Sequence, residues 1–208
     1  MGQAVLAALL ADKSYTAVHS VGRRELSLQH PKLAQHKGDF ASPSLFAKLP
    51  HIDDCFIALG TTIKVAGSQA AFRAVDFDAV LSVAHAAYAR GATKLGVVSA
   101  MGANADSSIF YNRVKGEMEL ALDKIGFRSV VIARPAMLAG DRAALDQPAR
   151  GGETLGLLLT KLLNPLVPAN YRSIQSRDVA ASLVQGVRSA PTGLVTLLSG
   201  DMQGAGRR

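Results

Sequence analysis

Short apolar runs alternate with segments of helical periodicity along most of this chain, and this alternation limits the possible folds more than any other feature. A helical pattern at 3–11 is followed by an apolar run at 15–21, and the same succession recurs toward the C-terminus. Strands that alternate with helices in this way form parallel sheets whose two faces are covered by the helices. The sequence therefore predicts an α/β fold with a doubly wound parallel sheet.

The other expected elements follow in the same order. Strands are expected at 33–39, 54–59, 94–99, 129–133 and 194–198, and helices at 42–49, 68–90, 109–125 and 177–189. With 208 residues, of which 49% are apolar and 19% charged, the chain can form one sizeable core. We expect a single domain over 1–208, in which 136–208 contribute a small substrate lobe because the alternation weakens after Pro135.

Composition excludes several classes of function. Lys and Arg number 23 against 16 Asp and Glu, but the positive residues are scattered and aromatic content is 5%, so we expect no nucleic-acid partner. No apolar stretch is long enough to predict a membrane span. The one cysteine, Cys55, lies in an apolar run and is expected to be buried and inert. Without a secretory signal pattern, the expected location is cytoplasmic. We expect no metal site.

Tyr111 and Lys115 form a Tyr-x-x-x-Lys pair within the helical pattern of 109–125. Residues four apart share one face of a helix, so the Lys115 ammonium can lie beside the Tyr111 phenol. A phenol has a pKa of about 10, and a neighbouring positive charge favours its ionised form. Ser99, at the end of the preceding strand, could hold a substrate oxygen. The three side chains indicate carbonyl/alcohol redox chemistry, although the pair alone also fits a half-exposed tyrosine beside a solvated lysine.

Polar residues or glycines follow each expected strand from 15–21 to 129–133. Ligands of open parallel sheets bind outside the carboxyl ends of the strands. In chain order these exits are Arg23-Arg24, Asp39, Gly60-Thr61-Thr62, Ser99 and Arg134-Pro135. The two arginines suit a ribose 2′-phosphate, with no acidic residue expected beside them, and Asp39 could accept a hydrogen bond from an adenine amine. Each exit alone could be an ordinary turn, but together they predict a nucleotide-binding edge.

Five segments carry a resemblance to a known family: Leu59–Thr62, Phe72–Asp76, Val97–Ala103, Tyr111–Glu117 and Ile132–Pro135. Over nearly its whole length the chain resembles the atypical short-chain dehydrogenase/reductases, in the branch related to the Tat-interacting protein. The resemblance implies a Rossmann-like fold, NADP(H) preferred over NAD(H), and a catalytic trio. In that trio Ser99 orients the carbonyl, Tyr111 is the acid or base, and Lys115 binds the nicotinamide ribose, while Pro135 lines the nicotinamide pocket.

The N-terminus departs from the family pattern. Members of this group open with an apolar strand and a Gly-x-x-Gly-x-x-Gly turn that brings the cofactor pyrophosphate to a helix N-terminus. Gly2 matches only the last of these glycines, so the first strand is expected to be missing. A start codon assigned at an internal Met and a real truncation both explain this. We expect the two flanking strands to lack a partner, NADPH to bind weakly to residues 1–208 alone, and exposed strand edges to favour self-association.

Two functional classes remain open. The first is an NADP(H)-dependent oxidoreductase that acts on a small carbonyl or alcohol, and the second is a non-catalytic NADP(H) sensor or regulatory protein. The complete trio of Ser99, Tyr111 and Lys115 favours the enzyme. A nucleotide-sugar epimerase or dehydratase shares the trio, but the tail after Pro135 is short for holding a large sugar nucleotide. The sequence does not specify the substrate.

Overall fold

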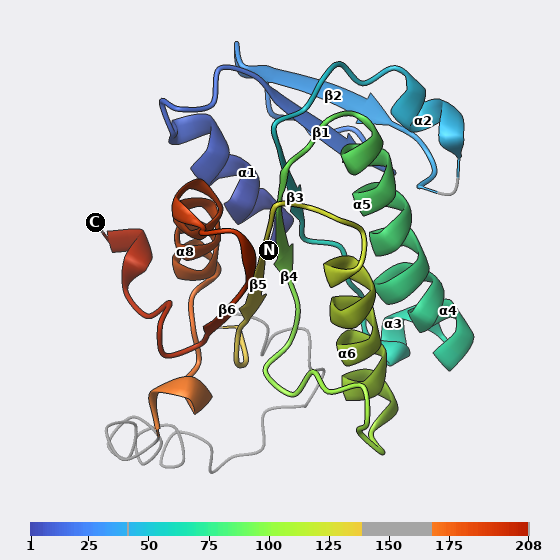
Figure 1. Cartoon of the computed structure of the whole chain (residues 1–208), viewed down its shortest axis with the longest axis vertical. Helices are drawn as coiled ribbons and strands as arrows, with labels where there is room; N and C mark the ends of the chain where they lie inside the picture. Colours follow the sequence, from blue (N-terminus) through green and yellow to red (C-terminus); the bar gives the residue numbers. More distant parts are fainter. Residues whose placement is uncertain (41, 139–167, 208) are drawn as a thin grey trace, which may run out of the picture.

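The strands form two parallel sheets in the computed structural model, which describes residues 1–40, 42–138 and 168–207. The smaller sheet pairs β1 (Val18–Gly22) with β2 (Leu33–Lys37). The larger contains, in spatial order, β3 (Asp54–Ile57), β4 (Lys94–Val98), β5 (Ser129–Arg134) and β6 (Gly193–Leu198). Figure 1 shows the smaller sheet across the top and the larger one upright in the centre. The predicted α/β class is confirmed.

Backbone hydrogen bonding is interrupted between β1 and β3. In the described residues β1 pairs only with β2, and at the edge nearest β1 the larger sheet ends with β3. This interruption agrees with the expectation that two strands lack a ladder partner. The Tyr15 hydroxyl, just before β1, donates a 2.8 Å hydrogen bond to Asp54 Oδ2, and the Tyr15 ring meets Phe56 edge-on at 5.9 Å. Side chains therefore link the two sheets at this point.

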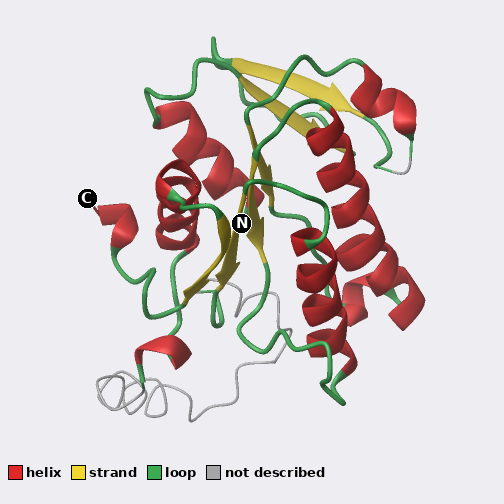
Figure 2. Ribbon diagram, in the orientation of Figure 1, coloured by secondary structure: helices red, strands yellow, loops and turns green. Residues whose placement is uncertain are grey.

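Helices cover both faces of the larger sheet (Figures 1 and 2). One face carries α1 (Gly2–Ala11) and α8 (Ser176–Ser189), and the other carries α5 (Val80–Ala89) and α6 (Phe110–Asp123). Strand β5 contributes to both apolar cores, because successive side chains of a strand point to opposite faces. Val131 packs with α1 and α8, whereas Val130 packs with α5 and α6. A strand buried on both faces explains the unbroken apolar run that the sequence shows there.

The helix predicted at 68–90 is divided. It consists of α4 (Gln69–Arg73), a π-helix over Ala74–Ala79 and α5. A short helix that the sequence analysis did not predict, α3 (Ile63–Ala66), precedes it. The N-caps mark both starts, because Thr62 Oγ1 accepts from Val65 N and Ser68 Oγ accepts from Ala71 N.

The C-terminal region contributes directly to the larger sheet. Helix α8 packs on β4 and β5, and β6 extends the sheet beside β5. Residues 139–167, which the sequence analysis placed in the substrate lobe, lie outside the described residues. The remaining short elements are α2 (Pro43–Ala47), η4 (Ala169–Tyr171) and η5 (Ala205–Arg207).

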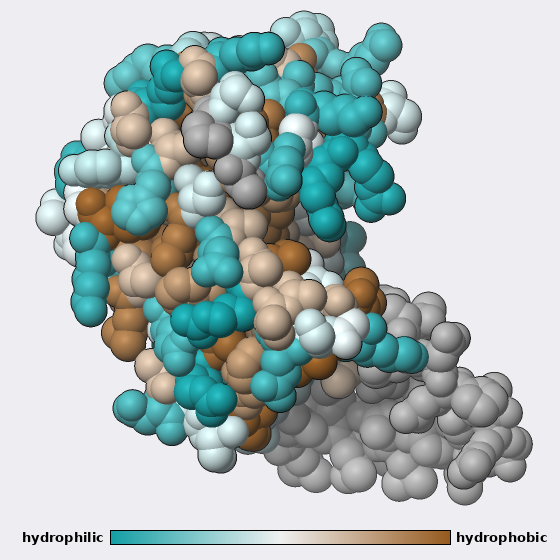
Figure 3. All heavy atoms as spheres, turned by 90° about the vertical axis from the view of Figure 1, so that its right-hand side faces the viewer, coloured by the Kyte–Doolittle hydropathy of each residue, from teal (hydrophilic) through white to brown (hydrophobic). Residues whose placement is uncertain are grey.

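The structure also shows the environment of the cysteine and the character of the molecular surface. Cys55 is buried, as expected, and burial raises the pKa of its thiol to about 12, so it remains un-ionised near neutrality. Figure 3 shows apolar residues interspersed with polar ones on the face turned toward the viewer. Tyr88 of α5 and Leu120 of α6 are among the exposed large hydrophobic side chains. Among the described helices, none has the length and apolar character needed to cross a bilayer.

Candidate active site

A buried ion pair joins α6 to the π-helix. Lys115 Nζ lies 2.7 Å from Asp76 Oδ1, and the two side chains are only 4% and 1% exposed. The contact is electrostatic, without the geometry of a directed hydrogen bond at Oδ1. The other carboxylate oxygen, Oδ2, accepts a 2.8 Å hydrogen bond from Thr61 N. Because buried charges are costly unless paired, Asp76 explains how Lys115 can be buried, and it connects Lys115 with the turn after β3.

The turn after β3 lies directly against this ion pair. A Cβ added to Gly60 would come 3.3 Å from Asp76 Oδ1 and 3.8 Å from Lys115 Nζ, so a larger residue would crowd the pair. Thr61 contributes its backbone N–H, as described above. Thr62 caps α3 with its hydroxyl oxygen. Of the three residues predicted at this exit, the structure brings Gly60 and Thr61 to Lys115 and gives Thr62 a structural role.

Ser99 lies directly after β4, as predicted, and its side-chain oxygen has no hydrogen-bond partner in the described part of the chain although the residue is only 7% exposed. Buried hydroxyls in folded proteins are almost always paired, so an unpaired one calls for a ligand or water. The backbone holds the residue firmly, since Ser99 N donates to Ala133 O at 2.8 Å. Met101 N donates to Pro135 O, which brings the exits of β4 and β5 together.

The loop between β4 and α6 packs tightly on α6. A Cβ added to Gly116 would lie 2.1 Å from Ala105 N, which is shorter than any real contact of this kind. Asn104 N also donates to Asn112 O at 3.0 Å. Only glycine at position 116 allows this approach, and the result is that the segment leading from Ser99 is fixed against the helix that bears the tyrosine and the lysine.

Tyr111 lies one turn before Lys115 on α6, and its ring packs against Phe72 with centroids 5.4 Å apart. Burial, followed by the negative charge of Asp76, raises the pKa of the Tyr111 phenol above its usual value. The sequence analysis expected the opposite direction, with Lys115 favouring the phenolate. The direction differs because Asp76 offsets the lysine charge and burial disfavours an anion. Tyr111 is therefore a protonated phenol at neutral pH.

Arg134, at the end of β5, is occupied by Glu119 of α6. Its Nε lies 3.1 and 3.2 Å from the two carboxylate oxygens, and its Nη2 lies 2.5 Å from Oε2. Glu119 is 5% exposed. This bidentate pair anchors the end of β5 to α6 and sets the position of Pro135, the next residue, at the exit.

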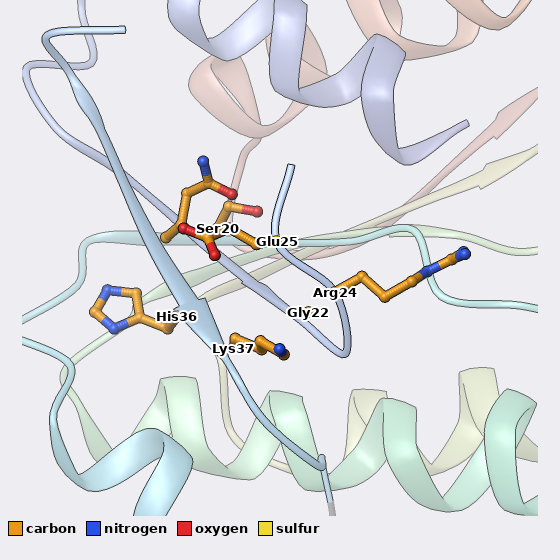
Figure 4. Close-up of a pocket in the computed structure, with 7 residues that line it drawn as sticks. Ser20, Gly22, Arg24, Glu25, His36 and Lys37 are labelled. Carbon is orange, nitrogen blue, oxygen red and sulfur yellow. The ribbon is translucent and has the colours of Figure 1, made fainter. Parts of the chain in front are cut away.

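Arg24 lines a small hollow at the carboxyl ends of β1 and β2, of about 100 Å³ (Figure 4). Ser20, Gly22, Glu25 and Lys37 also line it. In Figure 4 the Arg24 side chain points away from those of Ser20 and Glu25. The expectation that no acidic residue lies there is wrong, because the turn after β1 brings Glu25 into the wall. The hollow has room for a small group such as a phosphate. Its volume is smaller than the roughly 300–1,000 Å³ of a pocket that encloses a whole ligand.

A larger hollow of about 330 Å³ adjoins the first. Lys37, Asp39 and Lys48 are among the residues that line it, so Asp39 lies at the exit of β2 as predicted. Arg23 is exposed beside Arg24 but lines neither hollow. No ion pair between described residues involves Arg23 or Arg24. The exits of β1 and β2 therefore offer arginines that no described carboxylate binds.

Gly2 is the first residue of α1, and Met1 is its N-cap. Figure 1 places this end of the chain at the centre of the molecule, beside the larger sheet. The first turn of α1 contains no acidic side chain. A helix N-terminus without a carboxylate favours an anion. The position of Gly2 near a cofactor phosphate stays a prediction.

Comparison with known proteins identifies the family. No family model matches the chain. HTATIP2 of Rattus norvegicus is 32% identical over 206 residues, which span 97% of this chain and 80% of the rat protein. FMP52-1 of Scheffersomyces stipitis is 30% identical over 196 residues, 89% of this chain and 86% of that protein. The chain belongs to the HTATIP2/FMP52 family. This is a family of NAD(P)-binding proteins related to the short-chain dehydrogenase/reductases.

Solved structures support the Rossmann-like fold. A short-chain dehydrogenase family protein from Francisella tularensis has a TM-score of 0.61 and 17% identity, covering 96% of this chain and 93% of its own. MoeE5, in complex with UDP-glucose and NAD, has a TM-score of 0.65 and 17% identity, covering 95% of this chain and 72% of its own. At these identities the likeness establishes the fold alone, and it confirms the predicted fold class.

The relatives contradict the expected cytoplasmic location. The FMP52 proteins of Scheffersomyces stipitis, Candida albicans and Saccharomyces cerevisiae are all named mitochondrial. The expectation relied on a single cysteine and on the lack of a secretory signal pattern. Neither feature distinguishes the cytoplasm from a mitochondrial location.

Asp76 is the main site residue that the sequence analysis missed. It had been noted within the segment Phe72–Asp76 only as part of the family resemblance. The available signal was its spacing, because Asp76 lies four residues from Phe72 and from Val80, both of which are buried. A carboxylate on the apolar face of a helical pattern predicts a buried partner. Among the described residues, no group of three or more His, Cys, Asp or Glu side chains could hold a metal ion.

Proposed function

We propose that this protein is an NADP(H)-dependent oxidoreductase that reduces a small carbonyl compound, with the reverse alcohol oxidation as the same reaction. The observation that carries the proposal is the buried Ser99 hydroxyl, which has no hydrogen-bond partner among the described residues. The loop that follows it packs on α6, the helix that bears Tyr111 and Lys115. The chain's family of NAD(P)-binding proteins supports the proposal. These three residues then act as the catalytic trio, and Gly60, Thr61 and Pro135 contribute to the cofactor side of the site.

The chemistry follows from the protonation state of the trio. When bound, NADPH would supply the hydride for the carbonyl carbon, and Gly60, Thr61, Lys115 and Pro135 would line its site. Ser99 donates a hydrogen bond to the carbonyl oxygen and fixes its position. Tyr111 donates its phenolic proton to the same oxygen, which completes the alcohol. Lys115 is held by its ion pair with Asp76, and the N–H groups of its ammonium would serve as donors to the ribose of the cofactor.

The preference for NADP(H) is assigned to the hollow between β1 and β2. Arg24 and Lys37 supply positive charge there, against the single carboxylate of Glu25. A 2′-phosphate gains charge-assisted hydrogen bonds from such cations, whereas a free ribose hydroxyl would engage the carboxylate. Arg23 adds to the same local potential from its exposed position. Asp39 and Gly2 are assigned to the adenine and to the pyrophosphate.

The test measures turnover by the full chain with NADPH and a panel of small aldehydes and ketones. Turnover is monitored as the loss of absorbance of the reduced nicotinamide. NADPH is supplied up to millimolar concentrations, so that weak binding does not conceal activity. Tyr111→Phe should lower turnover by roughly 10²–10⁴-fold and leave NADPH affinity nearly unchanged. Tyr88→Phe, which alters an exposed tyrosine on α5, is the matched control. Normal turnover by Tyr111→Phe would contradict the proposal, and NADPH binding without turnover on any substrate would favour a regulatory protein.

A further inference from the structure

Two histidine side chains meet on the smaller sheet, and the proposed reaction uses neither of them. His19 belongs to β1 and His36 belongs to β2. His19 Nδ1 lies 3.0 Å from His36 Nε2. The two rings are stacked, with centroids 5.2 Å apart and planes inclined by 29°. The sheet therefore brings together two imidazole nitrogens from residues that are 17 positions apart in the chain.

The ladder between β1 and β2 explains why these side chains meet. His19 is paired with Ala34, and His36 is paired with Val21, so the two histidines lie diagonally on adjacent strands. Residues two apart along a strand point to the same face of the sheet, as do paired residues. Figure 4 accordingly shows the His36 side chain on the opposite side of β2 from that of Ser20. The positions of both imidazoles are thus set by the register of two hydrogen-bonded strands.

The distance between the facing nitrogens suits two ligands of a single metal ion. An imidazole nitrogen binds Zn²⁺ at about 2.0–2.1 Å, so two such ligands separated by an angle of about 90–110° lie about 2.8–3.4 Å apart. The observed separation of 3.0 Å falls within this range. In the free protein one imidazole N–H donates to the other ring. A neutral imidazole can carry its proton on either nitrogen, so moving that proton to the far nitrogen leaves both facing nitrogens free to bind.

The surroundings of the two rings leave space for an ion with further ligands. Both residues are only partly buried. His36 also lines the two hollows at the exits of β1 and β2. The described residues hold no group of three or more His, Cys, Asp or Glu side chains that could bind a metal. Two protein ligands are therefore available, and water completes the coordination, as in metal sites that keep open positions.

The other three histidines of the chain have different surroundings. His85 is exposed on α5. His51 Nε2 lies 3.8 Å from Asp53 Oδ1, and both side chains are largely exposed. His30 Nδ1 accepts a hydrogen bond from Lys32 N. Within the part of the chain that the structure describes, only the pair on the smaller sheet has two imidazoles in contact.

We propose that His19 and His36 form a binding site for a divalent transition-metal ion of the kind that imidazole favours, such as Zn²⁺, Ni²⁺ or Cu²⁺. The ion would join β1 to β2 through side chains, in addition to the backbone ladder. Among the described strands, β2 pairs with β1 alone, so this second connection stabilises the edge of the smaller sheet. The site involves no member of the proposed catalytic trio, and the inference goes beyond the proposed function.

The direct test is a calorimetric titration of the full chain, prepared without a polyhistidine tag, with ZnCl₂. It is carried out at pH 7.5, above the ordinary imidazole pKa of about 6.5. One ion should bind per chain. His19→Ala and His36→Ala should each weaken binding at least about tenfold, because even the loss of a partner outside the ligand set costs about that much. His85→Ala, which removes an exposed histidine of α5, is the matched control and should bind as the unmutated chain does.

Three results of this titration would overturn the inference. The first is no Zn²⁺ binding up to millimolar concentration. The second is unchanged binding in His19→Ala or in His36→Ala, provided that circular dichroism shows the variant to be folded. The third is an equal loss of binding in His85→Ala, which would indicate adsorption to scattered histidines.

A measurement on the unmutated chain covers the case in which the histidine variants fail to fold. One equivalent of Cu²⁺ is added, and electron paramagnetic resonance counts the imidazole nitrogens bound to the ion. Two nitrogens are expected, and one or none would contradict the site. Zn²⁺ should also raise the denaturant midpoint of the unmutated chain progressively with its concentration, since a ligand that binds the folded state stabilises it by mass action. A midpoint that does not respond to Zn²⁺ would mean that no ion joins the two strands.

Discussion

The two sheets carry the two halves of the candidate site in very different surroundings. In the larger sheet the residues of the proposed catalytic trio adjoin β4 and β5, and Lys115 and Asp76 are almost wholly buried. In the smaller sheet every residue of β2 is at least partly exposed, and Arg24 lies in a shallow hollow. Burial makes each charge in the first region dependent on one partner, whereas solvent screens the charges in the second. Substitutions should therefore cost far more in the larger sheet.

The largest effect is expected for Lys115→Ala, which removes one member of the buried pair. Asp76 is left as an unpaired buried carboxylate, so the free energy of unfolding should fall by roughly 3–5 kcal/mol. Turnover and cofactor binding should both be impaired. Denaturant unfolding measures the stability change, with Lys124→Ala at the exposed C-terminal end of the same helix as control. A loss below about 1 kcal/mol, the value of surface pairs, would remove the contrast between the two regions.

The nucleotide side should respond through selectivity rather than stability. Replacing Arg23 and Arg24 by Ala should remove most of the preference for NADPH over NADH, on the order of 1.5–3 kcal/mol for a charge-assisted bond. Glu25→Gln should widen the preference, because it removes the carboxylate that opposes a phosphate. Calorimetric titration with each cofactor measures both changes, and Arg128→Ala, an exposed arginine before β5, serves as control. Equal affinities for the two cofactors in the unmutated chain would contradict the assignment of this hollow.

The close packing of the loop between β4 and α6 on Gly116 of α6 can be tested by Gly116→Ala. The added methyl group would meet Ala105 N at 2.1 Å, so the loop after β4 must move away from α6. Overpacking of this kind costs about 1–3 kcal/mol, and turnover should fall because Ser99 moves with the loop. Gly2→Ala is the control for stability, since no atom of the described residues lies within 4 Å of its added Cβ. If Gly116→Ala is as stable and active as the unmutated chain, the loop is not fixed by this contact.

The sequence predicted the elements better than the contacts between them. Alternating apolar runs are a local signal, and they located the strands to within a few residues. The long helix at 68–90 was wrong in its middle, because a helical pattern does not distinguish a π-turn from an α-turn. The pairing of Asp76 with Lys115 spans 39 positions and depends on how the sheet stacks the helices. The predicted direction of the Tyr111 pKa shift was wrong because it did not include Asp76, whose position near the site the sequence alone does not show.

The segment between the two regions provides the smallest and most specific test. Tyr15→Phe removes the hydrogen bond to Asp54 but keeps the ring against Phe56, so unfolding should become easier by about 0.5–1.5 kcal/mol at neutral pH. Burial, and then the bond to Asp54, raise the pKa of Tyr15 in the folded protein. A raised folded pKa gives stability that is present below the unfolded value of about 10 and is lost as pH rises above it. The unmutated chain should thus lose stability faster than Tyr15→Phe above about pH 10, as denaturant unfolding at several pH values would measure. If Tyr15→Phe and the unmutated chain had the same stability and the same pH dependence, apolar contacts alone would hold the two sheets together. The Tyr15 hydroxyl would then contribute nothing to the contact between the sheet near the proposed catalytic trio and the sheet near the proposed 2′-phosphate site.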